Sequence, residues 1–239
     1  MNEPIIIEGL TKYYGNFLAL DGLNLRVVEN ENIGLLGPNG SGKSTTLKIL
    51  CCLIKPSSGK AFINGIDVTE NPEAALASTG ALIETPEFYA YLTPQETLTY
   101  LGNLRGMKGT QLKSRIDEVI KLVGLEKWAN VKIEKFSRGM KQRLGLAQAL
   151  LHDPKILILD EPALGLDPRG IVEFREIIEN AGREKTVFFA SHQLDEVTRI
   201  CDRVAFIAGG KLLLYESLET IQANYGTLEQ AYLKLTGAL

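Results

Sequence analysis

Short apolar runs and helical stretches alternate along the chain. Strands buried on both faces of a parallel sheet form continuous runs of branched apolar residues. Such runs occupy Asn32–Leu36, Thr79–Ile83 and Ile156–Leu159, and a fourth strand is predicted at Thr186–Ala190. Helices are predicted in the segments between these strands. This alternation predicts an α/β fold whose parallel sheet is joined by crossover connections.

A smaller antiparallel region is predicted ahead of that sheet. The short β-branched segments Pro4–Glu8 and Leu23–Val28 are expected to be strands, with a turn at Asp21-Gly22 before the second. Asn64-Gly65, directly after a predicted strand at Lys60–Ile63, is a strong hairpin signal. We therefore expect an N-terminal antiparallel β-subdomain.

Residues 85–153 contain no strand pattern. A capping box from Thr93 to Glu96 begins one helix, apolar spacing over Gln111–Val123 predicts a second, and Ser137 caps a third. These helices are expected to form a subdomain inserted into the α/β core. The other helices are predicted at 43–52, 168–180, 194–200, 218–224 and 228–235, with a short one that begins at Pro72 after the cap Asn71, and a last hairpin joins 203–208 to 211–215.

Composition narrows the possible partners and compartment. The 239 residues carry a net charge of −3, so no basic excess argues for a nucleic-acid partner. The three cysteines, Cys51, Cys52 and Cys201, follow no metal or disulfide spacing, which favours a reducing compartment. The polar N-terminus opens no signal peptide, and no apolar run approaches the ~20 residues of a membrane span. A cytoplasmic protein is expected, and any membrane role must come through another chain.

The first chemical motif is a phosphate-binding loop that follows the strand Asn32–Leu36. The pattern G-x-x-x-x-G-K-[ST] predicts that backbone N–H groups and a helix N-terminus cradle a polyphosphate. Gly37, Gly40 and Gly42 are expected to allow positive φ angles and close approach. Lys43 is expected to reach the β- and γ-phosphates, and the Ser44 hydroxyl to reach Mg²⁺. The full candidate loop is Gly37, Pro38, Asn39, Gly40, Ser41, Gly42, Lys43, Ser44 and Thr45.

A second motif closes the strand Ile156–Leu159. Asp160 and Glu161 stand where the carboxyl end of a central parallel strand meets ligands in α/β proteins. Asp160 is placed to hold Mg²⁺ through a water molecule alongside Ser44, and Glu161 to orient and deprotonate an attacking water. These two motifs alone are also compatible with a small-molecule kinase or a GTPase. The chain lacks the Asn-Lys-x-Asp motif that reads guanine.

The order of the motifs resembles the ATP-binding cassette (ABC) transporter ATPase subunits. After the phosphate loop come Phe136–Met140, the Asp160-Glu161 pair, Ala163–Asp167 and Ser191-His192, and the resemblance covers residues 3–215. It implies a P-loop NTPase (RecA-like) core within a single nucleotide-binding domain, 1–239. In that division the α/β core is 1–84 with 154–215, the helical subdomain is 85–153, and the C-terminal helical tail is 216–239.

The resemblance also implies roles for particular residues. Tyr14 matches the aromatic residue that stacks on adenine, although its neighbour Tyr13 could compete for that role. Ser137 and Gly139 match signature residues that contact ATP bound to a second subunit, and His192 matches the γ-phosphate histidine. The resemblance therefore implies an ATP-dependent head-to-tail dimer with catalytic Lys43, Glu161 and His192. Separate integral membrane permease subunits would hold the chain on the inner face of the membrane.

The sequence departs from the family pattern at two positions. Glu84 stands where the family usually has Gln; a carboxylate there could bind ATP-site Mg²⁺, or be a plain strand-end residue. The signature Leu-Ser-Gly-Gly-Gln is Phe-Ser-Arg-Gly-Met here, so Arg138 either strengthens the ATP contact or points to solvent. The other histidine, His152, is expected to be a surface residue at a helix end.

Gly80–Pro86, followed by Phe88-Tyr89, resembles the branch that serves bacitracin and lantibiotic export and self-immunity. Phe88, Tyr89 and Tyr91 could form an apolar ledge for a membrane subunit, or pack into the helical insertion. The resemblance implies an ATPase that drives export of a peptide antibiotic or drug-like compound, a function linked to antibiotic resistance. The alternative is a non-transport or regulatory ABC ATPase with low turnover.

Overall fold

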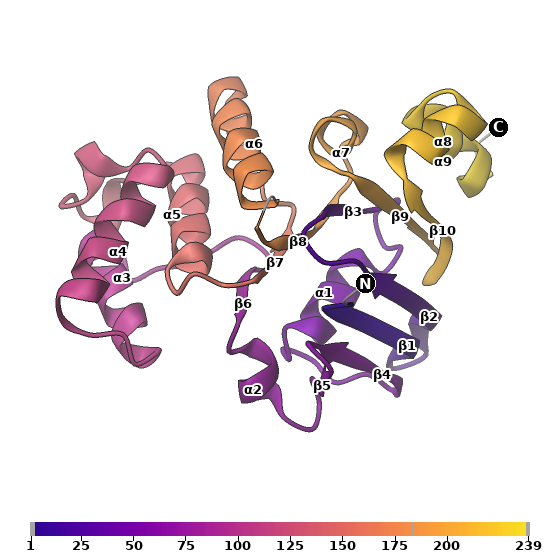
Figure 1. Ribbon diagram of the computed structural model, residues 1–239, viewed down its shortest axis with the longest axis horizontal. Helices are drawn as coiled ribbons and strands as arrows, with labels where there is room; N and C mark the ends of the chain where they lie inside the picture. Colours follow the sequence, from indigo (N-terminus) through magenta and orange to yellow (C-terminus); the bar gives the residue numbers. More distant parts are fainter. Residues whose placement is uncertain (1–2, 183, 238–239) are drawn as a thin grey trace.

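The computed structural model describes residues 3–182 and 184–237 as a mixed α/β protein with two sheets (Figure 1). One sheet is antiparallel, in the order β2-β1-β4-β5, and the other has six strands in the order β10-β9-β3-β8-β7-β6. In Figure 1 the helices α3, α4 and α5 gather on one side of the sheets, and α8 and α9 lie on the other. None of the described helices is long and apolar enough to cross a membrane.

The six-stranded sheet confirms the predicted parallel core. The strands β3 (Asn32–Leu36), β8 (Thr186–Ser191), β7 (Ile156–Asp160) and β6 (Thr79–Leu82) pair in parallel, with β6 at the edge of the sheet. β9 (Arg203–Ala208) pairs with β3 in parallel, and β10 (Lys211–Ser217) closes that edge as an antiparallel hairpin. The carboxyl ends of β3, β6, β7 and β8 therefore meet along one edge.

The antiparallel sheet contains one correction. β1 (Ile5–Tyr14) and β2 (Phe17–Val27) are longer than predicted, and the chain reverses at Gly15, whose φ is 57°, rather than at Asp21-Gly22. Gly22 has a φ of 64° and lies within β2, near a shift in register. A glycine in this conformation inside a strand marks a bulge. Gly22 therefore marks an irregularity of the backbone, but this irregularity is a bulge within β2 and not the predicted turn. β4 (Ser58–Ile63) and β5 (Ile66–Asp67) form the predicted hairpin.

The helices follow the predicted caps. Asn71 accepts a hydrogen bond from Ala74 N at the start of α2 (Pro72–Leu76), and Thr93 and Glu96 form the capping box of α3 (Pro94–Leu104). Ser137 accepts from Met140 N at the start of α5. The remaining helices are α1 (Lys43–Leu50), α4 (Gly109–Leu122), α5 (Arg138–Leu150), α6 (Pro168–Gly182), α7 (Leu194–Ile200), α8 (Leu218–Tyr225) and α9 (Leu228–Thr236), with short 3₁₀ turns η1 (Glu126–Trp128) and η2 (Ile133–Lys135).

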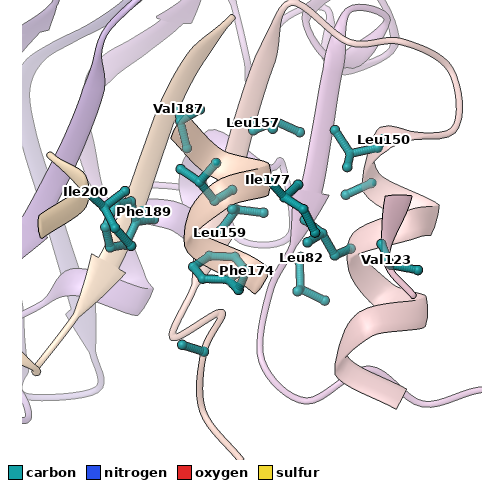
Figure 2. Close-up of a cluster of buried hydrophobic side chains, with 14 of the residues drawn as sticks. Leu82, Val123, Leu150, Leu157, Leu159, Phe174, Ile177, Val187, Phe189 and Ile200 are labelled. Carbon is teal, nitrogen blue, oxygen red and sulfur yellow. The ribbon is translucent and has the colours of Figure 1, made fainter. Parts of the chain in front are cut away.

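Alternating residues of the parallel sheet enter two different cores. Ile156 and Ile158 of β7 pack on the side of α1 and the antiparallel sheet. Leu157 and Leu159, which point the other way, join a cluster that includes Leu82, Leu150 and Phe174 (Figure 2). This second cluster also contains residues of α4, so the helical insertion shares a core with the sheet. The sheet is thus covered on both faces, and ligands can reach it only at its edges.

Candidate functional site

The phosphate-loop candidate occupies the turn from β3 into α1. β3 is buried throughout, and α1 begins at Lys43 with Gly42 as its N-cap residue. Gly42 has a φ of 107°, and a Cβ there would lie 2.6 Å from Leu20 Cδ2. Gly40, at φ 79°, has open space around it. The loop therefore has the positive-φ glycines that a phosphate cradle requires at both positions.

Gly37 serves a different purpose from the one predicted. It is not among the described positive-φ glycines, but a Cβ at this position would lie 2.0 Å from the Ile207 carbonyl oxygen. Its role is close packing of the loop against β9, and not a left-handed backbone. Ser41, which is buried, supports the same packing. Its carbonyl accepts a hydrogen bond from Gly210 N, just after β9, at 3.1 Å.

Lys43 is held within its own loop. Its Nζ donates to the Gly37 carbonyl at 2.7 Å and to the Pro38 carbonyl at 3.2 Å. Burial lowers the pKa of Lys43, an effect opposed by the nearby carboxylates of Glu161 and Asp160. Two backbone carbonyls are weaker partners for an ammonium group than a polyphosphate, so Lys43 is available to an incoming anion.

Asp160 ends β7 beside the loop and is almost fully buried. It shares a hydrogen bond with the Ser44 hydroxyl, and burial raises the pKa of its carboxyl group. Its Oδ1 atom is buried without a hydrogen-bond partner among the described residues. A buried, unpartnered carboxylate oxygen next to a hydroxyl is a suitable donor set for Mg²⁺, which binds one or two carboxylates together with phosphates.

Glu161 and His192 lie together at the same edge of the sheet. Oε2 of Glu161 and Nδ1 of His192, directly after β8, are 2.8 Å apart. Glu161 has a φ of 46°, an uncommon angle for a residue other than glycine, and its N–H donates to the Ala190 carbonyl. Uncommon backbone angles of this kind cluster at functional sites, where the surrounding structure imposes them.

Glu84 lies at the end of the neighbouring strand but is turned elsewhere. It follows β6 with a φ of 62° and lines a cavity of about 190 Å³ together with Asp160 and Glu161. Its carboxylate forms an ion pair with Lys48 of α1. The structure thus brings Glu84 to the same cavity as Asp160. Its carboxylate pairs with Lys48, and not with the predicted metal site at Ser44 and Asp160.

The tyrosines and the signature segment lie at the surface of the chain. Tyr14 is half-exposed near the turn of the first hairpin, and it contributes to the electrostatic environment of Lys48. Tyr13 is also half-exposed, and as its strand neighbour it faces the opposite side of the sheet. Ser137 is exposed, and Arg138 is exposed as well, lying against Gly165 and beside the cavity of Glu161.

No hydrogen bond or ion pair within residues 3–182 and 184–237 joins Ser137 or Gly139 to the loop 37–45. Gly139 instead lies near the Gly165 carbonyl of the same chain. Within the described residues, Ser137 and Gly139 therefore make no polar contact with the phosphate loop of their own chain.

Two residues that the sequence did not single out support the site. Glu196 is buried and accepts a 2.5 Å hydrogen bond from the Ser191 hydroxyl, next to His192. Burial raises the pKa of Glu196. Gln142 of α5 is buried and donates to the Pro162 carbonyl at 3.0 Å, which links α5 to the turn after Glu161. No spacing signal identifies Glu196, because Ser191 ends β8 whereas Glu196 lies in the first turn of α7.

His152 corrects the prediction of a surface residue. It follows α5 but is half-buried, and its Nε2 is 3.1 Å from the Thr79 carbonyl oxygen. Burial, followed by the charge of Arg105, lowers its pKa to about 4. A neutral imidazole that donates to the carbonyl of Thr79, the first residue of β6, is a structural feature, at the opposite end of the strands from the carboxylates of the site.

Fold and site together define a P-loop nucleoside-triphosphate-binding protein. Residues 20–164 match the family model for the ABC transporter. The chain is 45% identical over 238 residues to the ABC transporter ATP-binding protein YdbJ of Bacillus subtilis, covering 98% of this chain and 75% of that protein. It is also 45% identical over 215 residues to the bacitracin transport ATP-binding protein BcrA of Bacillus licheniformis, covering 89% and 69%.

Solved structures agree. An ATP-binding subunit of an ABC transporter superimposes with a TM-score of 0.88 at 29% identity, covering 97% of this chain and 99% of that one. A dimeric cassette, MJ0796, in a post-hydrolysis state with ADP and Pi, gives a TM-score of 0.81 at 26% identity, covering 89% and 98%. The chain belongs to the ABC transporter family, and it is an ATP-binding and ATP-hydrolysing subunit.

Proposed function

We propose that this subunit drives export of a peptide antibiotic or drug-like compound through separate membrane subunits. Two relatives, from Bacillus licheniformis and Enterococcus faecalis, are bacitracin transport ATP-binding proteins, at 45% and 40% identity. The observation that carries the ATPase mechanism is the buried, unpartnered Oδ1 of Asp160 beside Ser44 and Lys43. In this proposal the chain is cytoplasmic and lies on the inner face of the membrane through its permease subunits.

The loop Gly37–Thr45 would bind the phosphates of ATP, with Tyr14 against the base. Lys43 would exchange its two backbone carbonyls for phosphate oxygens. Ser44 and Asp160 would hold Mg²⁺, with Glu84 as a further candidate ligand. When bound, Mg²⁺ supplies positive charge that stabilises the transferring phosphoryl group.

Glu161 and His192 would carry the hydrolytic step. Glu161 would accept a proton from the attacking water, and its contact with His192 fixes where that carboxylate points. His192 is half-exposed, so its other ring nitrogen is free to approach the γ-phosphate. The Ser191–Glu196 hydrogen bond holds the segment on which His192 stands.

The second half of each site would come from another copy of the chain. Ser137 is the N-cap of α5 and Gly139 lies in its first turn, and the N-terminus of a helix is a position that favours anions. Since they lie away from their own phosphate loop, a head-to-tail dimer would place them on the ATP of the partner. A two-fold dimer completes both sites at once.

Residues 85–153 would act as the helical subdomain between the α/β core and the membrane, with 216–239 as a C-terminal tail. Phe88 packs on the core, whereas Tyr89 and Tyr91 are 60% and 64% exposed with ring centroids 5.6 Å apart. We infer that this aromatic pair contacts a permease subunit. Phe88 thus follows the packing alternative, and the exposure of Tyr89 and Tyr91 supports a contact with a permease subunit.

A phosphate-release assay on the purified chain tests the proposal. Turnover that requires Mg²⁺ and is lost in Lys43→Met is expected. Turnover that survives Lys43→Met would remove the loop from its catalytic role, and ATP binding without turnover in the wild type would favour a regulatory subunit. Co-purification of an integral membrane protein with the wild type, and not with Tyr89→Ala/Tyr91→Ala, tests the transport assignment.

A further inference from the structure

Glu84 forms an ion pair with Lys48, a residue to which neither the sequence nor the comparisons give a role. Glu84 comes two residues after β6, in a left-handed conformation, at the end of the parallel sheet where Glu161 also lies. Lys48 stands in the last turn of α1, the helix that begins at the phosphate loop. The pair therefore joins the loop after β6 directly to the phosphate-binding helix.

Lys48 is the more firmly held partner. Its side chain is 27% exposed, whereas that of Glu84 is 64% exposed. The hydrogen bond that Lys48 donates to the Glu84 carboxylate raises the pKa of Lys48, and the carboxylate of Asp160 contributes in the same direction. A cation in the last turn also interacts favourably with the helix dipole. Lys48 is thus the less exposed cation with which the more exposed carboxylate of Glu84 pairs.

The segment after Glu84 belongs to the helical insertion. The Ala90 carbonyl accepts from Glu134 N, and the Leu92 carbonyl accepts from Ile133 N, both at 2.9 Å. Pro86 lies against Gly145 of α5. The ion pair is therefore where a segment carried by the helical insertion is attached to α1.

We propose that Lys48 is a positioning residue that holds the Glu84 carboxylate, and with it the segment 84–92, against α1 while the site contains no metal. The inference rests on the proposed function, in which Glu84 is a candidate Mg²⁺ ligand. One carboxylate then has two competing cations, because Glu84 lines the same cavity as Asp160 and can reach a metal there only by leaving Lys48. A glutamine at position 84 would lack the charge for this exchange. Release of Lys48 would free the segment that carries Tyr89 and Tyr91.

Hydrogen exchange on nucleotide-free protein, with EDTA present, tests this directly. Lys48→Met and Glu84→Gln are each expected to speed amide exchange in residues 84–92 by about two- to fivefold, the range for a partly exposed ion pair. The double variant should exchange no faster than either single variant, because both remove one interaction. Lys48→Arg should restore slow exchange.

The matched control is Lys60→Met, which breaks an ion pair with Asp67 in the β4–β5 hairpin and should leave 84–92 unchanged. Unchanged exchange in Lys48→Met, or additive effects in the double variant, would overturn the proposal. A general loss of stability would speed exchange in β7 as well, and that pattern would also count against a local positioning role. The experiment uses neither ATP nor turnover, so its failure leaves the ATPase assignment intact, and a failed phosphate-release assay leaves this result intact.

Discussion

Nδ1 of His192 lies 2.8 Å from Oε2 of Glu161, although 31 residues separate them in sequence. The two residues follow adjacent parallel strands, β8 and β7, whose carboxyl ends meet at one edge of the sheet. The sheet therefore brings a potential base and its orienting partner together before any substrate is bound. The fixed contact leads to a prediction about turnover.

His192→Ala is expected to lower kcat by about 100-fold or more, within the range for a lost acid–base partner. ATP affinity should change by less than about threefold, because the phosphate loop and Asp160 are untouched. Paired measurements of phosphate release and nucleotide binding check this. His192→Gln keeps a side-chain hydrogen-bond donor, so its kcat should lie between those of the wild type and His192→Ala. A His192→Ala enzyme within twofold of wild-type turnover would exclude His192 from the hydrolytic step.

Asp160→Asn is expected to separate stability from function. Burial raises the pKa of the Asp160 carboxyl, so the ionised group is disfavoured in the folded protein, and its removal should leave the Tm unchanged or higher in EDTA. In the wild type we expect Mg²⁺ to raise the Tm of the ATP-bound protein above its value in EDTA. In Asp160→Asn this additional rise should disappear. Thermal unfolding with ATP, in EDTA and in Mg²⁺, measures both effects.

Asp21→Asn is the matched control, since Asp21 pairs with Lys211 at the surface and should leave the Mg²⁺ effect intact. An Asp160→Asn protein that keeps the full Mg²⁺-dependent rise in Tm would show that this carboxylate does not hold the metal.

The buried imidazole of His152 predicts a specific pH dependence. Its pKa is about 4 in the folded protein and about 6.5 when unfolded, so only the unfolded state takes up the proton between these values. Its contribution to stability is therefore complete above pH 6.5 and declines as the pH falls toward 4. The free energy of unfolding of His152→Gln should fall less between pH 7 and 4.5 than that of wild type, by about 1–2 kcal/mol. Denaturant unfolding at both pH values measures this, and parallel profiles would refute the assignment.

Local patterns predicted most of the fold because they depend on neighbouring residues. The capping box at Thr93, the apolar run before Asp160 and the glycines around Lys43 each determine structure within a few residues. The turn at Gly15 was missed because Gly22 carries the same local signal and only strand pairing distinguishes them.

The rest of the site depends on contacts that no local pattern contains. The Lys48–Glu84 ion pair joins residues from a helix and a separate strand end, and the Gln142 bond to Pro162 joins two subdomains. His152 was predicted to be exposed because it stands at a helix end, whereas its burial depends on its contact with β6. Such contacts arise only from tertiary packing, so the sequence could predict which residues carry chemistry but not how they are held.

The most direct test of an ATP site shared between two chains is the oligomeric state of the Glu161→Gln variant in solution. Without its base the variant should bind ATP, hydrolyse it at least about 100-fold more slowly, and accumulate as an ATP-bound dimer. Adding Ser137→Arg should prevent the dimer, because that serine would face the partner's phosphates, whereas Ser114→Arg on the exposed face of α4 should not. For the Glu161→Gln single variant, size-exclusion chromatography with light scattering should show a mass twice that of the 26.3-kDa chain in Mg-ATP and a monomer in EDTA. A Glu161→Gln protein that remains monomeric with ATP bound, or one that turns over at the wild-type rate, would contradict the account.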